Sequence, residues 1–91
     1  MPEAGTVTVE LFGIPRQRAG RAELEVRAGT VGDLLEAVTR ACPALSGLIR
    51  PDGRLAPQYL LSLDGQRFLQ DPHEPLRPGD RVVLLSADAG G

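Results

Sequence analysis

The clearest pattern along the chain is helical and lies near its centre. Apolar residues recur with a spacing of three and four over the set Val31, Leu34, Leu35, Val38, Ala41 and Cys42. This spacing predicts an amphipathic helix with one buried face. Thr30 stands in the N-cap position with Asp33 three residues later, and Pro43 ends the helix. A short extra turn is expected after it, over 45–49.

Before this helix, apolar and polar residues alternate with a period of two. The alternation predicts strands over 6–12 and 22–27, each with one buried face. Between them, 14–20 is expected to be a loop in which Arg16 and Arg18 are solvated. Because the connection is short, we expect the two strands to pair antiparallel.

After the helix, two further apolar runs and a turn signal follow. Residues 59–63 predict a third strand, with Tyr59 half-exposed, and Asp64-Gly65 is a typical hairpin turn that leads into a short return strand over 66–69. The last strand is predicted over 81–86. Residues 87–91 are expected to form a free, flexible tail.

The order β-β-α-β-β-β, with one long helix, predicts an α+β fold of the β-grasp (ubiquitin-like) type. We expect a single domain over 1–91, with a mixed sheet packed on one main helix. The last strand is apolar at four successive positions, which favours a central place beside the first strand. One helix covers only one face, so an alternate pair of these residues is left near solvent, either as a partner surface or under loops. These four residues are Val82, Val83, Leu84 and Leu85.

Composition agrees with a globular domain, because 42% of residues are hydrophobic and 24% are charged. The net charge of −2 removes the general attraction to nucleic acid or to an anionic membrane. No apolar run reaches the length of a membrane span. The first residues lack the basic and apolar regions of a signal peptide, so we expect a cytoplasmic location.

Few side chains offer catalytic chemistry. Cys42 and His73 are the only residues of their kinds, too few for a structural zinc site, and no metal site is expected. A nucleophilic Cys42 assisted by His73 is one hypothesis, but a free cysteine at the end of an apolar helical face is more typical of core packing. All ten basic residues are arginine, which excludes lysine-based covalent catalysis. We therefore expect a protein that is not itself an enzyme.

The sequence ends Ala89-Gly90-Gly91, which allows two interpretations. The simpler one is a frayed terminus. The functional one is that the terminal carboxylate is the reacting group, since glycines can pass through a narrow tunnel into another protein's active site. That carboxylate is ionised at neutral pH and is a poor electrophile, so another enzyme would have to activate it with ATP.

The order of four motifs adds to the second interpretation. Together they resemble the ubiquitin-like sulfur-carrier family, which includes the small subunit of molybdopterin synthase and the sulfur carriers of thiamine and cysteine biosynthesis. The resemblance covers nearly the whole chain. Its motifs are Val-Thr-Val-Glu-Leu-Phe-Gly at 7–13, Gly-Thr-Val-Gly-Asp-Leu-Leu at 29–35, Pro-Leu-Arg-Pro-Gly-Asp-Arg-Val-Val-Leu-Leu at 75–85, and the terminal Ala-Gly-Gly.

The resemblance implies a mechanism centred on the last residue. A ubiquitin-activating-like adenylyltransferase would adenylate Gly91, and sulfur from a persulfide would replace AMP to give a thiocarboxylate. Gly90 and Ala89 would pass through the partner's tunnel. The carrier would bind no cofactor itself, and ATP would be used by the activating enzyme. We expect Phe12 and the apolar residues of the last strand to contact the partner.

The resemblance also leaves a choice of pathway. The chain is longer around 50–59 than the thiamine carrier usually is, which favours molybdopterin or cysteine biosynthesis. For molybdopterin, the partner would be the large synthase subunit. Two alternatives remain, a protein modifier joined through Gly91 to target lysines and a β-grasp interaction domain with an inert tail. Since the chain has no lysine, such a modifier could not build lysine-linked chains on itself.

Overall fold

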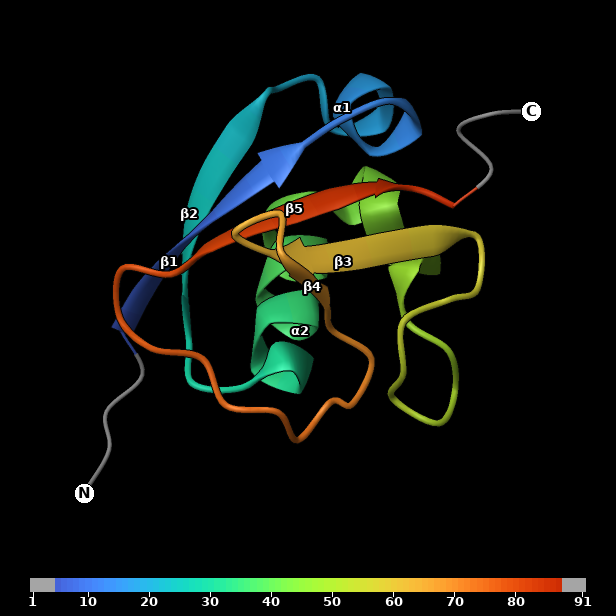
Figure 1. The fold of residues 1–91 in the computed structure, drawn as a ribbon. Helices are drawn as coiled ribbons and strands as arrows, with labels where there is room; N and C mark the ends of the chain where they lie inside the picture. Colours follow the sequence, from blue (N-terminus) through green and yellow to red (C-terminus); the bar gives the residue numbers. More distant parts are fainter. Residues whose placement is uncertain (1–4, 88–91) are drawn as a thin grey trace.

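The computed structural model describes residues 5–87. In this part of the chain, five strands form one sheet and helix α2 packs across one of its faces (Figure 1). This arrangement confirms the predicted α+β, β-grasp class. The elements follow in the order β1 (Gly5–Leu11), α1 (Ile14–Ala19), β2 (Glu23–Ala28), α2 (Val31–Ala41), the 3-10 helix η1 (Pro43–Leu48), β3 (Tyr59–Leu63), β4 (Arg67–Phe68) and β5 (Arg81–Ser86).

The strands are arranged in the order β2-β1-β5-β3-β4. β1 and β5 run parallel, and every other neighbouring pair in this sheet is antiparallel. The central position predicted for β5 is therefore confirmed. Because β1 and β5 are parallel, β5 ends beside the point where β1 ends and α1 begins (Figure 1).

Helix α2 begins at its predicted cap. The Thr30 hydroxyl accepts a hydrogen bond from the backbone N–H of Asp33 at 3.1 Å. Cys42 closes the last turn by donating its N–H to the carbonyl of Val38 at 2.8 Å. The buried face of α2 consists of apolar residues from the predicted helical pattern. The 3-10 helix η1 follows, where an extra turn was predicted. The core residues of α2 are Val31, Leu34, Leu35 and Val38.

The loop predicted over 14–20 is wrong, because helix α1 occupies most of it. Pro15 lies in the first turn, where a missing N–H breaks no helical hydrogen bond. Gly20 ends the helix in the left-handed conformation, with φ of 72°, and donates its N–H to Arg16 O. A helix this short shows no full apolar period, so the pattern alone did not reveal it. Arg16 and Arg18 are exposed, as expected.

The half-exposed position expected for Tyr59 is also wrong, since only 4% of this residue is accessible. In the β3–β5 register Leu60 lies opposite Leu85. This register directs the neighbours of Leu60, Tyr59 and Leu61, to the helix-covered face. The strand predicted over 22–27 is shifted by one residue, because β2 runs over 23–28.

The predicted hairpin between β3 and β4 is present. Asp64 and Gly65 both have positive φ, 53° and 70°, as a two-residue type I′ turn requires. The N–H of Gln66 donates to the carbonyl of Leu63 at 2.9 Å and closes the turn. The return strand β4 has two residues, fewer than the four predicted over 66–69.

Candidate functional site: the end of β5 and the open face of the sheet

The candidate reactive residues follow directly after β5. Gly91, Gly90 and Ala89 lie outside the described residues, so what the structure defines is the point from which they leave. At that point the backbone N–H of Ala87 donates to the carbonyl of Gln58 at 2.8 Å. The pairing of β5 with the chain before β3 thus extends one residue beyond the strand and fixes where the remaining four residues begin.

The alternation within β5 separates its apolar residues into two groups. Val82 and Leu84 are 0% and 1% exposed and pack in the hydrophobic core. Val83 and Leu85 are half-buried on the opposite face. Of the four β5 residues expected to contact a partner, only Val83 and Leu85 are therefore accessible. The pairing register of β5 with β1 and β3 determines which residues face solvent. The sequence could not show this, because all four residues of the run are apolar.

Phe12 lies on the same open face and is 46% exposed. Its N–H donates to the carbonyl of Leu84 at 3.0 Å, which continues the β1–β5 pairing and sets Phe12 beside Leu85. Across β5, Leu60 pairs with Leu85, so the apolar surface spreads over three strands. The fold therefore brings Phe12 together with the accessible half of β5, next to the start of the tail.

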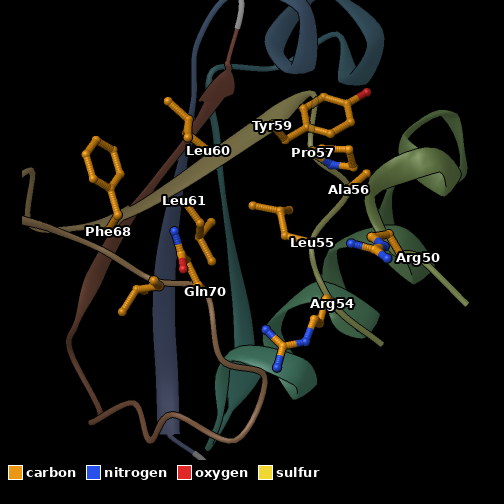
Figure 2. A pocket seen from close by; sticks show the side chains of 11 residues that line it. Arg50, Arg54, Leu55, Ala56, Pro57, Tyr59, Leu60, Leu61, Phe68 and Gln70 are labelled. Atoms are coloured by element: carbon orange, nitrogen blue, oxygen red, sulfur yellow. The ribbon is translucent and has the colours of Figure 1, made fainter. Parts of the chain in front are cut away.

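Two members of this surface were missed by the sequence analysis. Leu60 was obscured because Tyr59 was assigned the wrong face. Phe68, which is 61% exposed on β4, lies opposite Ser62 and borders Leu60 (Figure 2). We call Phe12, Leu60, Phe68, Val83 and Leu85 the open-face patch. The sequence did hold a signal for Phe68, because it follows closely on the tight turn at Asp64-Gly65. An aromatic residue on a very short edge strand cannot pack deeply into the core and is therefore expected to be exposed.

One side of the open face, over β1 and β2, is charged rather than apolar. Arg81 forms ion pairs with Glu10 at 3.5 Å and with Glu23 at 3.7 Å, across β5, β1 and β2. These pairs are exposed and contribute little to stability. Arg81 lies at the start of β5, but Glu10 is level with Val83 and Glu23 lies opposite Glu10, toward the end of the sheet where α1 begins. The charged residues therefore border the apolar part of the face on its β1–β2 side.

A pocket of about 260 Å³ lies beside β3, between the chain at 54–57 and the chain at 68–70. Figure 2 shows Leu60 and Phe68 on one side of β3, and Leu55 and Leu61 on the other. Two arginines, Arg50 and Arg54, also line it. Small-molecule sites usually occupy about 300–1,000 Å³. The volume is thus below the usual range for a cofactor.

The alternative catalytic residues do not form a visible reaction centre. Cys42 is buried at the end of α2, which confirms the expectation of core packing. His73 is exposed in the loop before β5, and its backbone N–H donates to the Asp71 carboxylate at 2.9 Å. Among residues 5–87, no group of three or more His, Cys, Asp or Glu side chains is placed to hold a metal ion. No helix in the same range is both long and apolar enough to cross a membrane.

These features define a ubiquitin-like β-grasp protein with an apolar open face beside its C-terminal strand. The sequence profile of the ThiS family matches residues 9–91. The chain therefore belongs to the ThiS family, and so to the ubiquitin-like proteins that act as sulfur carriers or small modifiers.

Solved structures agree with this membership. The crystal structure of small archaeal modifier protein 1 (SAMP1) from Haloferax volcanii shares 30% identity over 96% of this chain and 100% of its own, with a TM-score of 0.82. No curated protein matches the sequence significantly.

Two further structures share the fold at lower identity. A putative molybdopterin converting factor subunit 1 from Pyrococcus furiosus has 23% identity over 91% of this chain and 98% of its own, with a TM-score of 0.74. The structure of the Amycolatopsis orientalis BexX/CysO complex has 20% identity over 93% and 99%, with a TM-score of 0.77. At these identities the likeness shows the fold alone.

Proposed function

We propose that this protein is a sulfur carrier, with Gly91 as the residue that bears the sulfur. The observation that carries the proposal is the fixed exit of the tail, where Ala87 is hydrogen-bonded to Gln58 and four residues follow. The ThiS-family match supports it because it runs through residue 91. The protein acts as a carrier or non-catalytic subunit, and the chemistry is performed by enzymes that receive the tail, in the cytoplasm.

The chemistry starts from the terminal carboxylate. One carboxylate oxygen of Gly91 attacks the α-phosphorus of ATP in an adenylyltransferase, and pyrophosphate leaves. The terminal sulfur of a persulfide attacks the acyl carbon and displaces AMP. A thiol then cleaves the resulting acyl disulfide, which leaves a thiocarboxylate on Gly91. ATP is thus a substrate of the activating enzyme, and the carrier needs no cofactor of its own.

The open-face patch supports the expected docking to larger partners. Contiguous exposed apolar surface on a small protein commonly marks an interaction site. Here Phe12 and Leu85 lie where the tail begins, so a partner that receives the tail would also cover them. We propose that this surface, together with Val83, contacts the enzyme that accepts the sulfur.

The pathway we favour is molybdopterin biosynthesis, with this chain as the small subunit of the synthase. The long connection between η1 and β3 favours this pathway over thiamine biosynthesis, because the thiamine carrier is usually shorter there. The putative molybdopterin converting factor subunit 1 supports this pathway by fold alone, and the BexX/CysO complex supports a carrier in another pathway on the same terms.

A second candidate is protein modification through Gly91. The relative with 30% identity is named a small archaeal modifier protein, which favours this alternative. In that case Gly91 would be joined to lysine amines of other proteins. Because these 91 residues contain no lysine, a conjugated copy could not be extended through a lysine among them.

Intact mass spectrometry tests the carrier proposal. The full chain is incubated with its cognate adenylyltransferase, ATP, a persulfide donor and a thiol reductant. We expect a species heavier by the difference between one sulfur and one oxygen atom, and treatment with an alkylating reagent should label it. If this species never forms although the enzyme adenylates another carrier, the proposal is wrong.

A deletion variant supplies the control. The variant without Gly91 should lose sulfur loading and keep the melting temperature of the full chain, because no core residue is removed. A large fall in melting temperature would instead indicate a structural tail. For the modifier alternative, the result to look for is a Gly-Gly remnant on lysines of other proteins after tryptic digestion.

A further inference from the structure

The short tail limits how far a partner's reaction centre can lie from the folded part of the carrier. Gly91 is the fourth residue after Ala87, and four residues span at most about 14 Å when fully extended. This step rests on the proposed function, in which Gly91 reacts inside another enzyme. An enzyme that receives Gly91 must therefore cover the surface around Ala87, because the tail cannot reach a more distant site.

Helix α1 forms one side of that surface. It contacts β5, and Figure 1 shows it beside the end of β5 from which the tail leaves. The guanidinium of Arg18 donates a hydrogen bond to the hydroxyl of Tyr59 at 3.0 Å. Tyr59 in turn pairs with Ser86, the last residue of β5. The position of α1 relative to the start of the tail is thus held by the sheet itself.

The surface of α1 is basic in a chain that carries a net charge of −2. Residues 12–22 include Arg16, Arg18 and Arg21 and contain no Asp or Glu. None of the ion pairs found within 5–87 involves these three arginines. Arg21 donates to the backbone carbonyl of Glu23 at 3.2 Å, and Arg16 is exposed.

Two exposed apolar residues accompany the arginines. Phe12 and Ile14 are 46% and 42% exposed and flank Gly13 at the start of α1. A partner that covers this region buries apolar side chains and guanidinium groups together. Because an unpaired charge is costly to bury, the covering surface needs carboxylates opposite the arginines.

We propose that α1 is the docking surface for an acidic rim around the tail entrance of the adenylating enzyme. Arg16, Arg18 and Arg21 supply the charge, and Phe12 and Ile14 supply the apolar contact. Opposite charges raise the rate at which two proteins meet, which benefits a complex that forms and dissociates at every turnover. The adenylating enzyme is such a partner, whereas a permanent synthase subunit depends more on slow dissociation.

Charge reversal at Arg16 tests this surface, with Arg27→Glu as the matched control. Arg27 is exposed on β2 and pairs with Thr6, at the end of the sheet away from the tail. Both variants change the net charge by the same amount. The assay is ATP–pyrophosphate exchange catalysed by the cognate adenylating enzyme over a range of carrier concentrations.

For Arg16→Glu we expect the KM for the carrier to rise about tenfold with kcat unchanged, because the charge acts on encounter. The KM should also depend less on salt than that of the wild type. Arg16→Lys should restore the wild-type KM, and Arg27→Glu should behave as the wild type. All variants should keep the wild-type melting temperature.

Three results would overturn the proposal. One is an Arg16→Glu variant whose KM equals that of Arg27→Glu. Another is a fall in kcat at unchanged KM. The third is normal exchange followed by loss of sulfur delivery, which would assign the surface to the sulfur acceptor. If the wild-type chain itself supports no exchange while another carrier does, the proposed function fails, and this docking surface fails with it.

Discussion

Arg18 and Tyr59 are 41 positions apart in the sequence and are joined by a hydrogen bond of 3.0 Å between guanidinium and hydroxyl. The bond ties the short helix α1 to the first residue of β3. It also satisfies the hydroxyl of an almost fully buried tyrosine, which would otherwise lack a partner at the edge of the core.

Tyr59→Phe is expected to destabilise the protein by about 1 kcal/mol, because it removes one hydrogen bond and leaves the ring packing intact. Urea denaturation followed by circular dichroism measures the change. In the double variant with Arg18→Gln the two effects should not add, since each substitution breaks the same bond. Additive losses would show that the bond contributes nothing.

Leu84 and Leu85 are neighbours in β5 but should respond differently to truncation. Leu84→Ala empties a fully buried site and is expected to cost about 2–5 kcal/mol of unfolding free energy. Leu85→Ala, on the open face, should cost less than about half of that, since its side chain is only partly removed from water. Equal losses in chemical denaturation would contradict the assignment of faces.

Phe12→Ser should slow sulfur transfer to the accepting enzyme and leave the melting temperature nearly unchanged, because the ring is largely exposed. Phe68→Ser is the matched comparison, since Phe68 is also an exposed phenylalanine of the open-face patch but lies on β4, away from the tail. Single-turnover transfer from the loaded carrier measures both. A larger defect in Phe68→Ser would contradict a partner contact centred on the start of the tail.

Gly5→Ala is expected to destabilise the fold by about 1–3 kcal/mol through overpacking. A Cβ at position 5 would lie 2.4 Å from Pro78 Cγ and 2.8 Å from its Cα, and the proline ring and backbone cannot rotate away. Gly47→Ala is the control, because a Cβ there meets nothing within 4 Å. Thermal unfolding compares the two, and equal melting temperatures would show that β1 shifts without cost.

Much of the fold was predictable because its signals are local. The Thr30 cap, the apolar face of α2, the stop at Pro43 and the Asp64-Gly65 turn each depend on residues within a few positions of one another. The central place of β5 was also predictable, since a strand buried between two neighbours has apolar residues on both faces.

The features that were missed depend on distant residues. Helix α1 is held by contacts to β5 and by the bond from Arg18 to Tyr59, neither of which leaves a periodic pattern in six residues. The faces of Tyr59 and Leu60 are set by their register with Ser86 and Leu85. A shift of the register by one residue would move each side chain to the other face of the sheet. Because the segment 59–61 is apolar throughout, its sequence does not show which residues face the core.

The candidate site divides in the same way. The sequence by itself determined which end is proposed to react, because the Ala-Gly-Gly terminus and the motifs before it need no spatial information to be recognised. Tertiary structure alone decided which apolar residues accompany that end. Strand pairing brings Phe12 beside Leu85 and buries Val82 and Leu84 in the core, and the contact of α1 with β5 sets the arginines of α1 next to the start of the tail. The physical reason is that side chains alternate along a strand, so only the pairing register determines which of them reach solvent.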